Sequence, residues 1–255
     1  MVDDAPGGLS QKLAEQAAAA LGRAGFDLVQ PFRADLHGRA DPTALGLPAA
    51  LRPDGLALLI GASRSLWPAF AAAVTMDPPL AATDEPFDHW IEKTIDSTLG
   101  SLGVRVQLRF AHDPPPRLAI QRLAVLAGLA PLGPAALVAH PNFGPWISLR
   151  AVALLDAPGP AVPALPQLQP CAGCAAPCKT ALDEALGGRP LAEAGFGGDW
   201  PRWLGVRDAC PIGRDWRYSE AQIRYHYDPT ARAGVLHELV EAAGLLVRQK
   251  NKPAD

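Results

Sequence analysis

The chain has 255 residues, of which 49% are hydrophobic and 19% are charged, and its formal net charge at pH 7 is −3. A chain of this length can bury a sizeable core, and this composition excludes a disordered protein. The mildly acidic balance also excludes a globally basic surface of the kind that attracts nucleic acid, although it leaves room for local basic patches.

The N-terminus opens with two acidic side chains and lacks the basic start and apolar core of a secretory signal peptide. No stretch of about 18 apolar residues without charge occurs, so we expect no membrane span. We therefore expect the protein in the cytoplasm, where clustered cysteines more often serve metal or redox chemistry than structural disulfides.

The beginning of the chain has one helical and two strand-like patterns. Apolar residues at helical spacing predict a helix over 9–24, with Ser10 as its N-cap. Strands are predicted at 26–32 and at 55–63. The second of these is apolar throughout, which is typical of a strand that is buried on both faces.

The middle of the chain continues this mixture. A helix is predicted over 86–103 and an alternating, half-buried strand over 104–110. Residues 117–130 have helical periodicity, and 135–139 and 146–155 are predicted to be strands. Because helices and strands mingle without a strict βαβ rhythm, we expect an α+β fold with a mixed sheet flanked by helices.

Five prolines among residues 156–170 predict a stiff, extended connection across the surface. We place a boundary there, with a domain over 1–160 and a small C-terminal segment over 161–255. That segment is predicted to contain two helices, one capped by Ser219 and one over 230–249, which pack back on the core.

All four cysteines of the chain lie in two short stretches of this segment: Cys171, Cys174, Cys178 and Cys210. The first three have the spacing Cys-x2-Cys-x3-Cys in a loop rich in glycine and alanine, which lets the backbone wrap closely around a centre. The fourth is followed by proline, as at the end of ferredoxin ligand segments. The pattern predicts one 4Fe–4S cluster, which makes 161–255 a cluster-binding segment.

Two other interpretations of the cysteines stay open. A structural zinc site also takes four cysteines, but such sites usually pair two Cys-x2-Cys hooks, whereas here three ligands are local and one is single. The four thiols can also be unrelated buried side chains, since free cysteine is among the most buried residue types. Their confinement to two short motifs argues against that interpretation.

Two blocks of the sequence resemble the cobalamin-processing proteins of the methylmalonic aciduria and homocystinuria type C family. In that family a His-Pro-x-Phe-Gly-x-Trp motif precedes a strand that holds an arginine, and an Arg-Asp-Ala segment is followed by Arg-Tyr-Ser-Glu-x-Gln. The matching residues of the two blocks are His140, Pro141, Phe143, Gly144, Trp146, Arg150, Arg207, Asp208, Ala209, Arg217, Tyr218, Ser219, Glu220 and Gln222. Weaker likeness covers most of the remaining chain.

The same region is similar to the epoxyqueuosine reductases, in which a Pro-x-Phe-Gly-x-Trp loop lies between two strands upstream of a cluster motif. Both families place base-off cobalamin on a nitroreductase-like fold, so the resemblance implies a nitroreductase-like cobalamin-binding domain over 1–160. The type C proteins have no iron–sulfur cluster and the epoxyqueuosine reductases carry two, whereas this chain has cysteines for one. Asp113 lies near the position of the reductases' catalytic aspartate, and His112 near a type C histidine, but each is out of register, and no catalytic residue is assigned.

Six residues are predicted to bind the cofactor: His140, Phe143, Gly144, Trp146, Arg150 and Arg207. Arg150 interrupts an apolar strand, where an unpaired charge is costly to bury. It therefore either pairs with a carboxylate such as Asp208 or faces a pocket, where the type C arginine contributes to binding glutathione or cobalamin side groups. Arg207, three residues before Cys210, either has a similar role or tunes the charge of the cluster.

The loop 140–146 has a functional and a structural interpretation. Gly144 allows the close approach of a flat ligand, and Phe143 and Trp146 would then wall a planar macrocycle. The same aromatic side chains can also belong to the core. His140 either binds cobalt or a corrin amide, or it is structural, which is the commoner role of a single histidine.

These observations favour an enzyme or processing protein that binds cobalamin and reduces it, with electrons passing from the cluster to cobalt and removal of the upper ligand as one outcome. An electron donor such as a ferredoxin or flavodoxin is expected. The alternatives are an iron–sulfur flavoprotein reductase with FMN in place of cobalamin, and a non-catalytic binding protein that a metal staples together. A tRNA-modifying role like that of the epoxyqueuosine reductases is weaker, because the chain is acidic and lacks an additional basic module.

Overall fold

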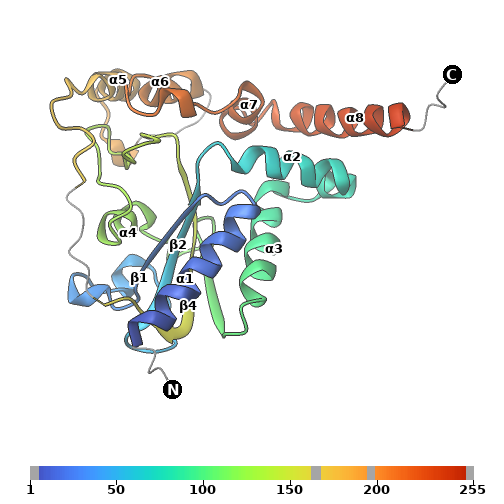
Figure 1. Cartoon of the computed structure of the whole chain (residues 1–255). Coiled ribbons are helices and arrows are strands. Elements are labelled where there is room, and N and C mark those ends of the chain that lie inside the picture. Colours follow the sequence, from blue (N-terminus) through green and yellow to red (C-terminus); the bar gives the residue numbers. More distant parts are fainter. Residues whose placement is uncertain (1–5, 162–167, 194–198, 251–255) are drawn as a thin grey trace.

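The computed structural model describes residues 6–161, 168–193 and 199–250. At the centre of the described chain lies a four-stranded sheet (Figure 1). Its strands, in their order across the sheet, are β1 (Leu28–Arg33), β2 (Gly55–Ala62), β4 (Ser148–Pro158) and β3 (Val106–Phe110). These four predicted strands are confirmed, and β2 is buried along its whole length, as its apolar sequence predicts.

The expected mixed sheet is wrong, because all three neighbouring pairs of strands are antiparallel. Parallel neighbours need a long crossover connection, usually a helix, between them. The chain does contain such a connection between β2 and β3, and these two strands run in the same direction. They are not neighbours, however, because β4 lies between them and pairs antiparallel with both.

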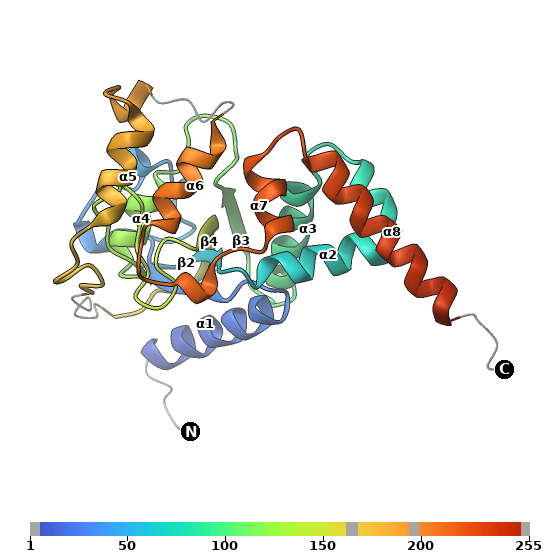
Figure 2. The same cartoon turned by 90° about the horizontal axis from the view of Figure 1, so that it is seen from above.

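Three helices cover one face of the sheet: α1 (Pro6–Arg23), α2 (Leu66–Met76) and α3 (Pro86–Gly100) (Figures 1 and 2). Leu58 and Ile60 of β2 pack into this apolar core. Successive side chains of a strand point to opposite faces, so the residues between them face the other side.

The opposite face is covered by α4 (Ile120–Leu126) and by loops. Leu59 of β2 and Val152 and Leu154 of β4 pack in this second core. The described residues also form five short 3-10 helices: Leu36–Gly38, Thr43–Leu45, Pro78–Ala82, Leu191–Glu193 and Arg214–Trp216.

Two local predictions are wrong. Residues 135–139 do not form a strand, because the N–H of Val138 donates to Oε1 of Gln121 at 2.9 Å and the segment makes only an isolated bridge. Ser10 is not the N-cap of the first helix, because α1 begins four residues earlier, at Pro6. Side-chain contacts and preceding residues decide these points, and neither appears in a local hydrophobic pattern.

The described residues of the C-terminal third form four further α-helices. Helices α5 (Pro177–Leu186) and α6 (Trp200–Asp208) lie side by side, and α7 (Glu220–Tyr227) leads into α8 (Arg232–Lys250), which lies along α2 (Figure 2). No helix in the described part of the chain is both long and apolar enough to cross a membrane.

The start of α7 follows the sequence prediction. The Ser219 hydroxyl accepts the backbone N–H of Gln222 at 3.3 Å, which caps the helix. Tyr225 of α7 and Val235 of α8 are 3% and 1% exposed and belong to the same apolar core as α1, α2 and α3. Burial of these two residues holds the C-terminal helices against the sheet domain.

Candidate functional site

A cavity of about 330 Å³ opens where β4 meets α6 and α7. Its lining residues are Ile120, Gln121, Leu137, Val138, Pro145, Ile147, Ser148, Leu149, Arg150, Arg207, Tyr218, His226 and Tyr227. We call it the arginine cavity. None of these described residues is acidic, so the cavity favours anions and groups that accept hydrogen bonds.

Arg150 reaches the cavity from β4, and its side chain is 19% exposed. Its Nε donates to the hydroxyl of Ser148 at 3.1 Å, and its guanidinium carbon lies 4.8 Å from the ring centroid of Phe87. The carboxylate of Asp88 lies 4.0 Å from its Nη1. Burial lowers the pKa of Arg150 from its ordinary value, and the charge of Arg207 lowers it further, so the two guanidinium groups repel each other across the cavity.

Arg207 reaches the cavity from the last turn of α6, and its Nη1 donates to the carbonyl oxygen of Pro145. Arg207 forms no ion pair within the described residues. The carboxylate of the adjacent Asp208 pairs instead with Arg217 at 2.7 Å. For the same reason the suggested pair between Asp208 and Arg150 is not formed. Of the six predicted cofactor residues, Arg150 and Arg207 are the two that line the cavity.

Two more polar groups of the cavity lack a hydrogen-bond partner within the described structure: the hydroxyl of Tyr218 and Nε2 of His226. Tyr218 is 5% exposed. Burial, together with the charges of three nearby arginines, lowers the pKa of His226 well below its ordinary value, so its imidazole is neutral at pH 7. Buried polar atoms without partners are rare in folded proteins, and at a cavity wall they mark groups that a ligand or water can satisfy.

His226 was missed by the sequence reasoning. It lies outside the matched second block, four residues after Gln222. Residues four apart lie on the same side of a helix, and Gln222 is 3% exposed. The signal in the sequence is therefore the position of His226, four residues after the matched Gln222 in a helix that Ser219 is predicted to cap.

His140 and Phe143 lie in the loop 140–146, outside the arginine cavity. Their rings stack with centroids 4.6 Å apart, and Phe143 meets the ring of Trp216 edge-on at 4.5 Å. Nδ1 of His140 accepts the backbone N–H of Asn142 at 3.2 Å, and burial lowers the pKa of His140. A neutral ring that accepts a backbone hydrogen bond braces the loop.

Gly144 and Trp146 also serve the packing of this loop. Trp146 is 1% exposed, and its ring lies 5.3 Å from that of Tyr218. Gly144 has a φ of +55°, and a Cβ atom there would overlap the backbone carbonyl of Ile212. The close approach that requires glycine is therefore one between two segments of this chain.

The four cysteines gather where α5 begins and α6 ends. Cys171, Cys178 and Cys210 line a small apolar cavity of about 20 Å³, which we call the cysteine cavity. Cys174 does not line it, and its sulfur accepts the backbone N–H of Ala176 at 3.4 Å. The structure thus brings together segments that are more than thirty residues apart in the sequence, as the predicted ligand set requires.

The electrostatics of the cysteines show that they interact. Burial raises the pKa of Cys171 and of Cys210, and the charges of the other cysteines raise both values further. Thiols that raise one another's pKa need a cation among them before all of them ionise. Within the described ranges, no group of three or more His, Cys, Asp or Glu side chains is arranged to hold a single metal ion. The chemistry of the donor set fits a thiolate-bound centre, but the side chains do not form a closed shell around one ion.

The cysteine cavity and the arginine cavity share part of their walls. Leu137 and Pro145 line both. Arg207 donates to the carbonyl oxygen of Pro145, and its own carbonyl accepts the N–H of Cys210 at 3.1 Å. The two cavities are therefore adjacent and share an apolar wall, which Leu137 and Pro145 form.

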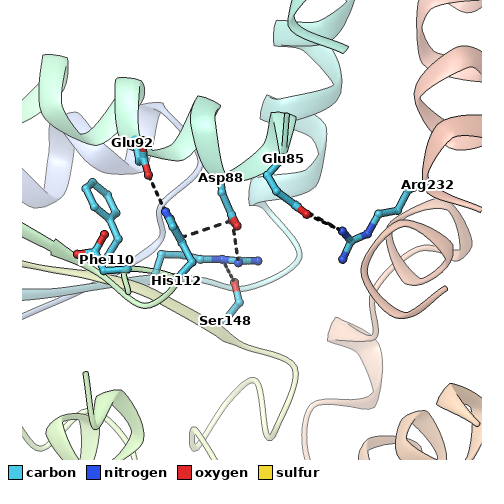
Figure 3. Close-up of polar contacts among 9 residues, drawn as sticks. Glu85, Asp88, Glu92, Phe110, His112, Ser148 and Arg232 are labelled. Carbon is cyan, nitrogen blue, oxygen red and sulfur yellow. Dashed lines mark hydrogen bonds and ion pairs between the residues drawn. The ribbon is translucent and has the colours of Figure 1, made fainter. Parts of the chain in front are cut away.

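A row of polar contacts leads from the arginine cavity to α3 (Figure 3). Oδ1 of Asp88 lies 4.0 Å from Nη1 of Arg150 and 3.7 Å from Nδ1 of His112. Nε2 of His112 lies 2.8 Å from Oε1 of Glu92. Asp88 and Glu92 are four residues apart in α3, so both carboxylates lie on the helix face that covers His112.

Asp113 lies apart from this row. It pairs with Arg109 at 3.1 Å and accepts the backbone N–H of Phe110 at 2.9 Å. It does not line the arginine cavity. These contacts give Asp113 a role in ending β3.

Comparison with known proteins bears on the fold. No protein-family model matches the chain, and no curated protein matches its sequence. Among solved structures it is similar to that of a C. elegans B12-trafficking protein, CblC, described as a homologue of human MMACHC. The TM-score is 0.60 and the identity 19%, over 91% of this chain and 97% of that one. The resemblance to the type C family is thereby confirmed for the fold, while the relation to the epoxyqueuosine reductases stays a prediction.

Proposed function

We propose that this protein binds cobalamin at the arginine cavity and reduces or processes it. The observation that carries the proposal is the meeting of Arg150 and Arg207 at one cavity, since they come from two separate sequence blocks that each resemble the type C family. Similarity to the fold of a B12-trafficking protein supports it. Guanidinium groups bind phosphate and other oxygen acceptors, and cobalamin carries amide oxygens around its ring and a phosphate in its nucleotide tail.

The size of the cavity sets what it can enclose. A volume of about 330 Å³ is near the lower end of small-molecule sites, about 300–1,000 Å³. We therefore expect it to hold one substituent of a corrin, with the flat ring outside its mouth. Arg150 and Arg207 would donate hydrogen bonds to that substituent. The other predicted cofactor residues would act by fixing the loop whose Pro145 carbonyl holds Arg207: His140, Phe143, Gly144 and Trp146.

We propose further that Cys171, Cys174, Cys178 and Cys210 hold one 4Fe–4S cluster. The convergence of Cys171, Cys178 and Cys210 at one apolar cavity supports this, since cysteine thiolates are the usual ligands of such a cluster. When bound, the cluster would supply single electrons, replenished by a donor such as a ferredoxin or flavodoxin. The apolar partition formed by Leu137 and Pro145 would exclude water between the two sites.

In this proposal both parts of the chain contribute to the site. Residues 1–160 would form a nitroreductase-like cobalamin-binding domain, which supplies Arg150. Residues 161–255 would supply the cluster ligands and Arg207. The protein would act in the cytoplasm, where clustered cysteines more often serve metal or redox chemistry than structural disulfides.

Titration with hydroxocobalamin tests the cobalamin proposal through the change in corrin absorbance on binding. We expect wild-type protein to bind, and Arg150→Gln and Arg207→Gln to bind at least about tenfold more weakly, because each loses a charge-assisted hydrogen bond. Arg117→Gln is the matched control, since Arg117 is exposed and does not line the cavity. No binding by the wild type, or equal affinity in Arg150→Gln, would contradict the proposal.

The visible spectrum of anaerobically purified protein separates the metal and cofactor alternatives. Broad absorption with matching iron and sulfide content would support the cluster. Resolved flavin bands would favour an FMN reductase. A colourless protein that contains zinc would favour the non-catalytic, metal-stapled alternative.

A further inference from the structure

His112 is bracketed by two carboxylates from consecutive turns of α3 (Figure 3). Its Nε2 lies 2.8 Å from Glu92, and its Nδ1 lies 3.7 Å from Asp88. The ring of Phe110 stacks on the imidazole with centroids 5.4 Å apart and planes 23° apart. The ring is therefore held in one orientation, with each nitrogen directed at a different carboxylate.

Both ring nitrogens of His112 thus face a carboxylate oxygen of α3. A neutral imidazole carries hydrogen on one nitrogen only, whereas an imidazolium donates from both. The side chains of His112 and Asp88 are each 26% exposed, so most of their surface is shielded from water. Charges in such partly buried positions are screened less than charges in open solvent.

Asp88 links His112 to the arginine cavity. Its Oδ1 lies 3.7 Å from Nδ1 of His112 and 4.0 Å from Nη1 of Arg150, so it lies at nearly equal distances from both. A carboxylate that moves onto Arg150 would neutralise one of the two guanidinium groups of the cavity. A carboxylate that is held by His112 leaves that guanidinium available to a ligand.

We infer that His112 is a positioning residue for the arginine cavity: it holds Asp88 away from Arg150 and keeps the charge of Arg150 available to a ligand. When His112 is replaced by glutamine, Asp88 pairs with Arg150 and the cavity attracts anions less. This inference rests on the proposed function only in that the arginine cavity binds a ligand.

The charged groups next to this row are engaged with one another. Arg109 pairs with Asp113 at 3.1 Å. Figure 3 shows the second pair, in which Arg232 of α8 lies 3.2 Å from Glu85. Among the described residues, Glu92 of α3 and Phe110 of β3 contact His112. Arg150 of β4 lies next to Asp88.

Calorimetric titration of the cobalamin-free protein with sulfate tests the inference. We expect His112→Gln to bind sulfate about three- to tenfold more weakly than the wild type, because Asp88 turns to Arg150. His112→Lys places an ammonium group between the two carboxylates and should retain the wild-type affinity. In an Asp88→Asn background, His112→Gln should have no further effect.

Several outcomes would overturn the inference. Unchanged sulfate affinity in His112→Gln, or the same loss in the Asp88→Asn background, would show that His112 does not act through Asp88. Absence of sulfate binding to the wild type would overturn it as well, while the hydroxocobalamin titration would still decide the proposed function by itself. Should His112→Gln fail to fold, His112→Asn takes its place, and unchanged sulfate affinity in that variant contradicts the inference.

Discussion

A Cβ atom on Gly144 would overlap the carbonyl group of Ile212, two residues after Cys210. The same holds in the other direction, because a Cβ atom on Gly213 would overlap the carbonyl group of Phe143. Both glycines have positive φ, at +55° and +73°. Two backbone segments thus meet with no side chain between them, and this junction joins the loop beside the arginine cavity to the loop of the fourth cysteine.

Gly144→Ala should therefore be unusually destabilising. Positive φ alone costs alanine about 1 kcal/mol, and forcing a methyl group against a backbone carbonyl adds about 1–3 kcal/mol, so we expect the free energy of unfolding to fall by about 2–4 kcal/mol. Gly103→Ala is the matched control, since Gly103 has a φ of +72° but nothing within 4 Å of its added Cβ. Urea unfolding measures both, and an equal loss in the two variants would refute a role for the junction.

Each of the four cysteines should be needed for iron. Replacing Cys171, Cys174, Cys178 or Cys210 with alanine is expected to remove most of the bound iron, because a cluster site built from four thiolates has no spare ligand in this chain. Thr180→Ala is the control, since Thr180 is exposed on the same helix as Cys178. Iron analysis and the visible spectrum provide the measurement. Full iron in Cys210→Ala would exclude Cys210 as the fourth ligand.

Asp88→Asn should strengthen anion binding. The change removes a carboxylate that lies 4.0 Å from Arg150, and we expect sulfate to bind about two- to fivefold more tightly. Glu85→Gln removes the same charge from the start of the same helix, but Glu85 pairs with Arg232 and does not contact Arg150. Equal tightening in both variants would mean that net charge, and not the contact with Arg150, controls the affinity.

His226 should make the protein less stable in acid. Its pKa is lowered on folding, so the unfolded state binds a proton first as the pH falls below about 6.5. The free energy of unfolding then falls by up to about 1.4 kcal/mol per pH unit for this one group. His226→Phe should therefore show a shallower loss of stability between about pH 7 and 5. His237→Gln is the control because the His237 side chain is 72% exposed. If the free energy of unfolding falls with pH equally steeply in the wild type and in both variants, His226 is not held neutral in the folded protein.

Local pattern alone predicted a good part of this protein. The apolar stretch at 55–63 became the fully buried strand β2, and Ser219 caps α7 as its position before a helical stretch predicted. The grouping of the cysteines also predicted that distant segments meet, since a shared ligand set requires it. These features depend on side-chain periodicity, capping chemistry and spacing, which act over a few residues and can be read from the sequence.

Only the tertiary structure decided how those elements are combined. The insertion of β4 between β2 and β3 makes the sheet antiparallel, and nothing in the three strand sequences specifies that order. Packing also places Arg150, Arg207 and His226 at one cavity. It brings the backbone of Gly144 into contact with that of Ile212. Each of these outcomes depends on contacts between residues far apart in the sequence. Such contacts are selected by the burial and hydrogen bonding of the whole core at once, so no local pattern carries the information.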